Sequence, residues 1–223
     1  MSNYSITRAS MVSRFGEKLK QRIRMFSGAE TGTVTVESVM ILPLLFFGVM
    51  ATFGYFDAYR KQSLALKANY AVADFLSRNY KFTPTTLAGL DDLFQYMSKT
   101  GDSSWVRVTI VECPTDKTLA QCNDAEPRQL ELWGNQTSGT ATGIVEHSVT
   151  TMREFLGPHI PKMYVGEKLF IVESVAKYKP LFPGRWTGIY SRDFEHIVVT
   201  GTREYDDLCY EESTGDCPAP AGV

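Results

Sequence analysis

The most apolar stretch of the chain runs from Val39 to Phe56 and reads VMILPLLFFGVMATFGYF. About 20 apolar residues form a helix long enough to cross a bilayer, so this stretch predicts a membrane-spanning helix. Between residues 33 and 79, glycine and proline occur only in the apolar portion, at Pro43, Gly48 and Gly54, where membrane helices tolerate them. We therefore expect one continuous helix over 33–79, about 70 Å long, that extends past the membrane.

Beyond the membrane, the apolar residues of this helix fall on two opposite sides. One narrow stripe contains Tyr55, Tyr59, Leu66, Tyr70 and Ala73, and the other side contains Leu64, Ala68 and Phe75. Two interpretations stay open. Either the helix is covered on both sides, by its own domain and by a neighbouring molecule, or it is simply buried in one core.

Shorter elements are expected after residue 83. Residues 86–99 have apolar positions at helical spacing, and so do residues 149–156, where Ser148 is the expected N-cap and Gly157-Pro158 the expected end. Alternating or β-branched runs predict four strands, Trp105–Glu112, Arg128–Trp133, Leu169–Tyr178 and His196–Glu204. Helix first and strands later indicate an α+β fold, with the N-terminal helix laid on an antiparallel sheet.

Charge divides the chain into a basic N-terminal part and an acidic remainder. Residues 1–32 carry six basic and two acidic side chains, a net charge of +4, and the rest carries 17 basic and 23 acidic ones, a net charge of −6. Positive flanks stay in the cytoplasm. We therefore expect a cytoplasmic leader over 1–32, a membrane-spanning and juxtamembrane helix over 33–80, and an α+β domain outside the cytoplasm over 81–223. The acidic remainder gives no support for a nucleic-acid partner.

The leader has apolar residues at spacings of three and four with basic residues between them, namely Met11, Phe15, Leu19, Ile23 and Phe26. This pattern is typical of an amphipathic helix on a membrane surface, and a disordered basic tail is the alternative. A secretory signal peptide fits poorly, because more than thirty residues precede the apolar core and no small-x-small cleavage site follows it. Glu17 and Glu30 argue against a mitochondrial presequence.

All four cysteines, Cys113, Cys122, Cys209 and Cys217, lie in the predicted outer domain. An even number confined to an oxidising compartment predicts disulfides. The preferred pairing is local, Cys113 with Cys122 and Cys209 with Cys217, which would close two short loops worth about 2–3 kcal/mol each in the chain-entropy model. Because the spacing is wider than that of zinc ligands, we expect no metal. The polar segments 113–127 and 134–143 are predicted to be surface loops.

Catalytic motifs are missing from the sequence. His147, His159 and His196 are isolated, and there is no GxSxG, no HExxH and no phosphate-binding loop. We therefore expect neither an enzyme nor a cofactor. Trp186 and Tyr190 fit either an adhesive surface or the core, and the usual burial of aromatic residues favours the core.

A glycine, four residues and a glutamate stand directly before the apolar helix, in the sequence from Gly32 to Glu37. This arrangement resembles the processing site of class III signal peptides, the prepilins. More narrowly, the stretch Gly32–Leu45 with its Leu42-Pro43 dipeptide is similar to the TadE/TadG-like family of the tight-adherence pilus. The continuation Tyr55–Asn79 looks like the juxtamembrane helix of alphaproteobacterial members. The resemblance covers about 50 of the 223 residues.

The resemblance implies that a membrane prepilin peptidase cuts after Gly32, so that Thr33 becomes the mature N-terminus. Glu37 would then pair with the new amine of a neighbouring subunit, since opposite charges at low dielectric attract strongly when the geometry is good. We also expect Glu37 in the first turn of the helix, where the macrodipole favours an anion. A helix-capping glutamate without any partner is the alternative.

From the resemblance we expect a pilin-like structural or assembly component of a tight-adherence pilus. It would lie in the bacterial inner membrane, with a cytoplasmic N-terminus and a periplasmic C-terminal domain, and its partners would be other pilins, pilus-assembly proteins and the prepilin peptidase. One alternative is an uncleaved, membrane-anchored assembly factor of the same system. The other is a membrane-tethered periplasmic enzyme or ligand-binding module, which a pocket with convergent polar groups would favour.

Overall fold

The computed structural model describes residues 33–100, 104–138, 144–212 and 217. The chain divides into two compact units, Met1–Thr52 and Phe53–Val223. The leader, for which the sequence predicts an amphipathic pattern, lies outside the described residues.

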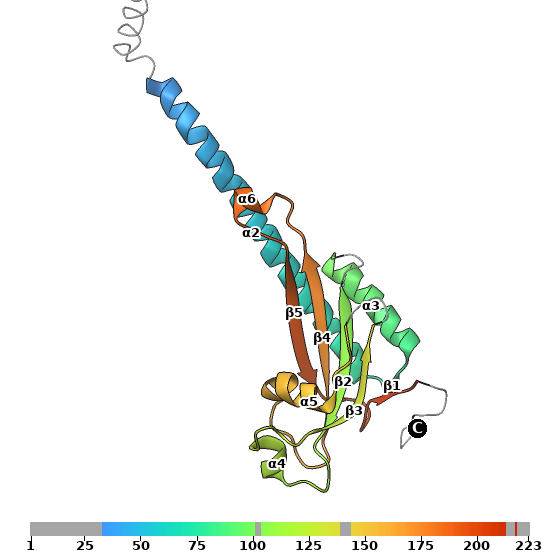
Figure 1. The fold of residues 1–223 in the computed structure, drawn as a ribbon. Coiled ribbons are helices and arrows are strands. Elements are labelled where there is room, and N and C mark those ends of the chain that lie inside the picture. The colour runs from blue at the N-terminus through green and yellow to red at the C-terminus, as the bar shows by residue number, and fades with distance from the viewer. Residues whose placement is uncertain (1–32, 101–103, 139–143, 213–216, 218–223) are drawn as a thin grey trace, which may run out of the picture. The chain divides into compact units, whose positions relative to one another are not determined.

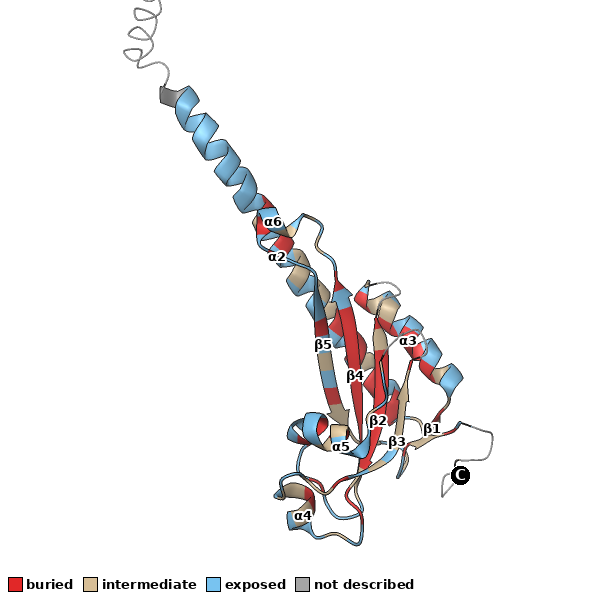
Figure 2. Ribbon diagram, viewed as in Figure 1, coloured by how far each residue is buried: buried red, intermediate tan, exposed pale blue. Residues whose placement is uncertain are grey.

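α2 (Thr33–Ser77) is one helix of 45 residues, which confirms the predicted continuous helix and keeps Pro43 in its interior. Among the described residues it is the one helix long and apolar enough to cross a membrane, with a mean hydropathy of 2.0 in its most apolar window. In the first unit, every residue over 35–49 is exposed (Figure 2). An apolar helix that is exposed all round is typical of a membrane span.

The second unit contains a four-stranded antiparallel sheet in the order β3-β2-β4-β5 (Figure 1). Its strands are β2 (Trp105–Glu112), β3 (Glu131–Thr137), β4 (Lys168–Tyr178) and β5 (Arg192–Thr200). A separate parallel pair joins β1 (Lys81–Phe82) to β6 (Cys209–Tyr210). A long apolar N-terminal helix and an antiparallel sheet agree with the α+β class predicted from the sequence.

One face of the sheet is covered by the second-unit part of α2 and by α3 (Pro84–Ser98). The core on this face joins Val108 and Val172 of the central strands to Leu90 and Phe94 of α3. The side chain of Thr83 accepts a hydrogen bond from the amide of Thr86 at 3.1 Å and caps α3 at its start. The helix predicted for 86–99 is therefore present and begins two residues earlier.

The buried side of α2 includes residues from both sides predicted from the sequence, Ala73 from one and Ala68 from the other. Its centre is formed by Ala65, Ala68, Val72 and Leu76, all fully buried against the sheet, whereas Tyr59 is 71% exposed. Tyr70 and Phe75, one from each predicted side, are also exposed, so the domain itself covers neither side completely. Cover of the tyrosine side by a neighbouring molecule stays a prediction.

The other face of the sheet is partly covered by short helices, which are α4 (Leu119–Asn123), α5 (Val149–Thr151), the π-helical η2 (Met152–Leu156) and the 3₁₀ turn η3 (Gly157–His159). The side chain of Ser148 accepts a hydrogen bond from the amide of Thr151, as predicted for the N-cap. The helix predicted over 149–156 is present as α5 followed by η2, and it ends at the expected Gly157, which is the C-cap of η2. The separate turn η3 follows, with Pro158 near its start, where the missing amide is not needed.

Two strands and two loops differ from the sequence prediction. β3 begins at Glu131 and continues to Thr137, into the expected loop 134–143, because the backbone of 134–137 pairs with β2. β5 spans Arg192–Thr200 and not His196–Glu204, since its ladder with β4 begins at Arg192, opposite Tyr178. The segment 113–127 contains α4, and both of its cysteines are buried. α6 (Gly184–Thr187), in the connection between β4 and β5, was not predicted.

Candidate functional site

The residues predicted for processing and assembly lie at the start of α2. Gly32 is outside the described residues, and Thr33 is the first residue of the helix. Glu37 is exposed, but the first turn of α2 contains no acidic residue. The prediction that Glu37 occupies the first turn was therefore wrong, since the helix begins at Thr33 and Glu37 falls one residue beyond that turn. The interaction of an anion with the helix dipole weakens beyond the first turn. Capping therefore does not explain why a carboxylate stands at this position.

The half-covered face of the sheet carries a buried ion pair at its centre. Arg107 on β2 lies directly opposite Glu173 on β4. Arg107 Nε donates to Glu173 Oε2 at 2.8 Å and Arg107 Nη2 donates to Glu173 Oε1 at 3.0 Å. Only 10% and 11% of the two side chains is exposed. This two-pronged geometry is the strongest form of a charge-assisted hydrogen bond between side chains.

The same pair fixes the segment that leads into α5. His147 Nε2 lies 2.9 Å from Glu173 Oε2, and Arg107 Nη1 donates to the carbonyl of Val145 at 2.9 Å. Asn135 Nδ2 donates to the carbonyl of His147 at 2.9 Å. Burial works to raise the pKa of Glu173, but the hydrogen bonds from His147 and Arg107 outweigh it, so this pKa is lowered and the carboxylate stays charged.

A hollow of about 550 Å³ lies beside this cluster. Its lining includes Trp105, His147, Phe155, His159, Glu173 and Glu195. Within the described ranges, no group of three or more His, Cys, Asp or Glu side chains could hold a metal ion. Because both oxygens of Glu173 already accept hydrogen bonds from Arg107, the geometry fits positioning of the segment 144–148 better than proton transfer.

The sequence contained a signal for this cluster. Arg107 and Glu173 stand in the middle of two otherwise apolar strands, at positions that alternate with buried valines such as Val106 and Val172. A charged residue at such a position needs a partner on the same face. His147 carried no comparable signal, because the loop that brings it to Glu173 has no periodic pattern.

A second polar cluster lies between α2 and the sheet. Asn69 Nδ2 donates to the carbonyls of Val172 and His196, both at 3.2 Å. Asn69 Oδ1, Ser174 Oγ and His196 Nε2 are buried and have no hydrogen-bond partner among the described residues. Burial lowers the pKa of His196, an effect that a backbone hydrogen bond with Gln62 opposes only in part. The neutral imidazole is therefore the favoured form in the folded domain.

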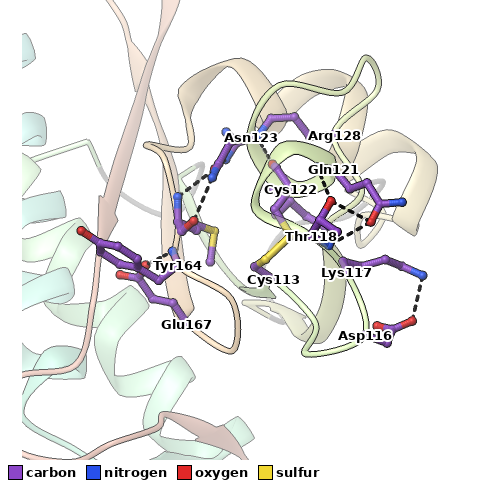
Figure 3. Close-up of a disulfide and its surroundings, with 12 residues drawn as sticks. Cys113, Asp116, Lys117, Thr118, Gln121, Cys122, Asn123, Arg128, Tyr164 and Glu167 are labelled. Carbon is purple, nitrogen blue, oxygen red and sulfur yellow. Dashed lines mark hydrogen bonds and ion pairs between the residues drawn. A yellow bond between two sulfur atoms is a disulfide. The ribbon is translucent and has the colours of Figure 1, made fainter.

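Both expected disulfides are present, with the local pairing. Cys113 is joined to Cys122 and Cys209 to Cys217. Figure 3 shows the first bond beside α4, whose start is closed by a capping box between Thr118 and Gln121. Disulfides of this kind persist mainly in oxidising compartments.

Arg128 connects the segments around the disulfide between Cys113 and Cys122. The sequence contains no sign of this function. Its guanidinium donates to the carbonyls of Cys122, Gly157, Ile160 and Pro161 and to Asn123 Oδ1. Asn123 in turn donates to the carbonyl of Met163 and accepts from the amide of the same residue, both at 2.9 Å (Figure 3). Three segments are thereby held together by one side chain with five donors.

Comparisons with protein families, curated proteins and solved structures find no match to this chain. The resemblance to prepilins and to the TadE/TadG-like family therefore rests on the residues from Gly32 to Leu45 and on the helix that follows them.

Proposed function

We propose that this chain is a pilin-like structural or assembly component of a tight-adherence pilus, anchored in the bacterial inner membrane by α2. The observation that carries the proposal is the two-part character of this one helix. Its residues over 39–49 are apolar and exposed all round, and its residues over 65–76 pack against an antiparallel sheet through buried alanine, valine and leucine side chains. A filament subunit needs both features, because the first part packs in the membrane or the filament and the second carries a rigid domain.

In this proposal the N-terminus is cytoplasmic and the second unit is periplasmic. The net charge of +4 over residues 1–32 and the two disulfides of the second unit support that orientation. A prepilin peptidase cuts after Gly32, and Thr33 becomes the mature N-terminus. Other pilins and pilus-assembly proteins are the partners.

Glu37 is the residue through which subunits recognise one another in this proposal. It is the one acidic residue of α2 in the described part of the first unit, and only Ser38 separates it from the apolar run. Its carboxylate pairs with the new amine of Thr33 in an adjacent subunit. Removing one partner of a buried ion pair costs about 3–5 kcal/mol, whereas a purely local interaction with the helix dipole is worth a fraction of that.

N-terminal sequencing of the protein extracted from membranes of cells with an active prepilin peptidase tests the cleavage. We expect the mature chain to begin at Thr33. Recovery of only the full-length chain would contradict the cleaved-pilin proposal and favour the uncleaved assembly factor.

The substitution Glu37→Gln tests the pairing. We expect the variant to insert and to be cut normally, but to lose co-assembly with partner pilins in pull-downs from membranes. Glu154→Gln, which removes an exposed carboxylate from the second unit, is the matched control and should co-assemble normally. Normal piliation with Glu37→Gln would show that the carboxylate has no intersubunit function.

The hollow beside His147 is the observation that favours the second candidate, a membrane-tethered ligand-binding module. A pilin-like subunit does not need such a hollow. Specific binding of a small molecule by the purified chain, abolished by a bulky substitution at a lining position such as Val175→Trp, would support this candidate.

A further inference from the structure

The connection between β4 and β5, which contains α6, lies beside α2 (Figure 1). A Cβ atom added at Gly54 would lie 2.8 Å from Ile189 Cδ1, so the side chain of Ile189 packs directly against the backbone of α2 at Gly54. Tyr178 Oη lies 3.4 Å from the carbonyl of Gly54 and 3.3 Å from Asp57 Oδ2. The connection is therefore held at the level of residues 54–57 of α2, where the apolar run ends and the first charged residue follows it.

Ile189 of this connection belongs to the core, but three other large side chains are exposed. Leu181 is 78% exposed, Trp186 51% and Tyr190 65%. The sequence-based preference for Trp186 and Tyr190 as core residues was therefore wrong. The connection itself is well built, because Gly188 ends α6 with a φ of 75° and Gly184 lies against Tyr190 and the carbonyl of Ile189.

The same segment is basic in an otherwise acidic unit. Residues 177–192 contain Lys177, Lys179, Arg185 and Arg192 and no acidic residue, although the chain from residue 33 onward has a net charge of −6. Three of these cations, together with Thr100 and Ser191, line a hollow of about 510 Å³. Asp193 is the one acidic residue in that lining.

We propose that residues 177–192 form an interfacial contact with the bilayer, in which the basic side chains bind anionic phospholipid headgroups and Trp186 and Tyr190 lie at headgroup level. The inference rests on the proposed anchoring by α2, which brings the connection to the membrane boundary. Tryptophan and tyrosine gather at this boundary because their rings are apolar and their tips polar. Clustered lysine and arginine next to a membrane helix are attracted by anionic lipid.

The contact has a structural consequence for the second unit. In this proposal the connection attaches the second unit to the bilayer in addition to α2, and two attachments restrict its orientation more than one does. The aromatic–basic connection would thus align the outer domain before it meets its partners.

Quenching of tryptophan emission tests the proposal on the full chain in nanodiscs of phosphatidylcholine and phosphatidylglycerol with brominated acyl chains. The double variant W105F/W133F retains only Trp186, and W105F/W186F retains only Trp133, a matched control that is 56% exposed on β3. We expect brominated lipid to quench the emission of Trp186, because such rings lie at headgroup level, and to leave that of Trp133 unchanged. Equal quenching of the two would overturn the proposal.

Lysine substitutions test whether the bound lipid is anionic. K177Q/K179Q in the Trp186-only protein should reduce quenching in phosphatidylglycerol discs to the level found in pure phosphatidylcholine, whereas K162Q, an exposed lysine of the loop before β4, should not. Equal quenching of the unaltered protein in both lipids would overturn the anionic specificity.

Extraction at alkaline pH separates this inference from the proposed function. If the chain is released from native membranes, the anchoring proposal itself fails. If the chain stays in the membrane and Trp186 is not quenched, only the interfacial contact fails.

Discussion

On the helix-covered face of the sheet, Val108, Val172 and Val198 belong to a continuous apolar core that α2 completes with alanines. On the opposite face, Arg107 and Glu173 occupy the alternate positions of the same central strands. The two faces meet different demands. The first attaches the sheet to the long helix and needs only close packing, while the second fixes a loop and needs directional hydrogen bonds.

The polar cluster between α2 and the sheet qualifies this contrast. Asn69 and His196 introduce hydrogen bonds into the apolar face, yet three of the buried polar atoms there have no partner among the described residues. On the opposite face, both carboxylate oxygens of Glu173 accept hydrogen bonds. Buried polar atoms without partners reduce stability, so the two faces should respond differently to substitution and to acid.

The largest effect is expected from breaking the ion pair on the half-covered face. Glu173→Gln leaves the Arg107 guanidinium buried without its counterion, which should lower the free energy of unfolding by about 3–5 kcal/mol. Urea unfolding of the full chain in detergent can be followed by tryptophan fluorescence, because all three tryptophans lie after residue 53.

The control for this prediction is Glu195→Gln, which removes an exposed carboxylate from the lining of the same hollow. Its urea midpoint should stay close to that of the unaltered protein. If Glu173→Gln and Glu195→Gln have the same midpoint, the ion pair does not stabilise this face.

The next largest effect should come from the disulfide between Cys113 and Cys122, which lies among the short helices on the half-covered face. Replacing Cys113 and Cys122 by alanine should cost about 2–3 kcal/mol, because the unfolded chain regains the freedom of the closed loop. The same replacement at Cys209 and Cys217 removes the second disulfide, whose closed loop is of similar length, and its cost can be compared with that of the first. Four alkylatable thiols in the freshly isolated native protein would refute both bonds and the proposed topology.

On the helix-covered face, a larger side chain between α2 and the sheet should destabilise the domain. Ala68 is fully buried between α2 and the sheet, so Ala68→Leu should destabilise the second unit by about 1–3 kcal/mol. Lys67→Leu adds the same side chain one position earlier, on the exposed side of the helix, and should have little effect on unfolding. Equal urea midpoints of the two variants would mean that the helix can move away from the sheet at low cost.

Periodic features were predicted well, and features created by contact were not. The long helix, the strands Trp105–Glu112 and Leu169–Tyr178, and the local disulfides were evident because apolar period, length and cysteine spacing are properties of a short stretch. β3 and β5 were displaced by three or four residues, since strand ends depend on the partner strand.

The polar sites were the hardest to predict. His147 reaches Glu173 only because Arg107 and Asn135 hold the backbone of its loop, and no local pattern in the sequence encodes that placement. Trp186 was assigned to the core on general tendency, whereas its exposure follows from where the β4–β5 connection lies. Placement of the predicted assembly residue Glu37 failed by a single residue, because the helix begins at Thr33 and its first turn ends before Glu37.

The smallest effect we predict concerns pH, and it separates the two faces by their titration windows. Because burial lowers the pKa of His196, the unfolded chain takes up a proton near the ordinary value of 6.5 that the folded domain does not accept. Stability should therefore decrease as the pH falls from 7.5 to 5.5, by at most about 1.4 kcal/mol per pH unit, the limit for one proton. The contribution of Glu173, whose pKa is also lowered, is fully present above its ordinary value of 4.5 and is lost only as the pH falls through its lower folded value.

Urea midpoints measured at intervals between pH 7.5 and 3.5 distinguish the two windows. His196→Gln should flatten the upper window and leave the lower one unchanged, whereas Glu173→Gln should act on the lower window. If His196→Gln keeps the full pH dependence above pH 5.5, the helix-covered face is not the part of the domain that responds first to acid.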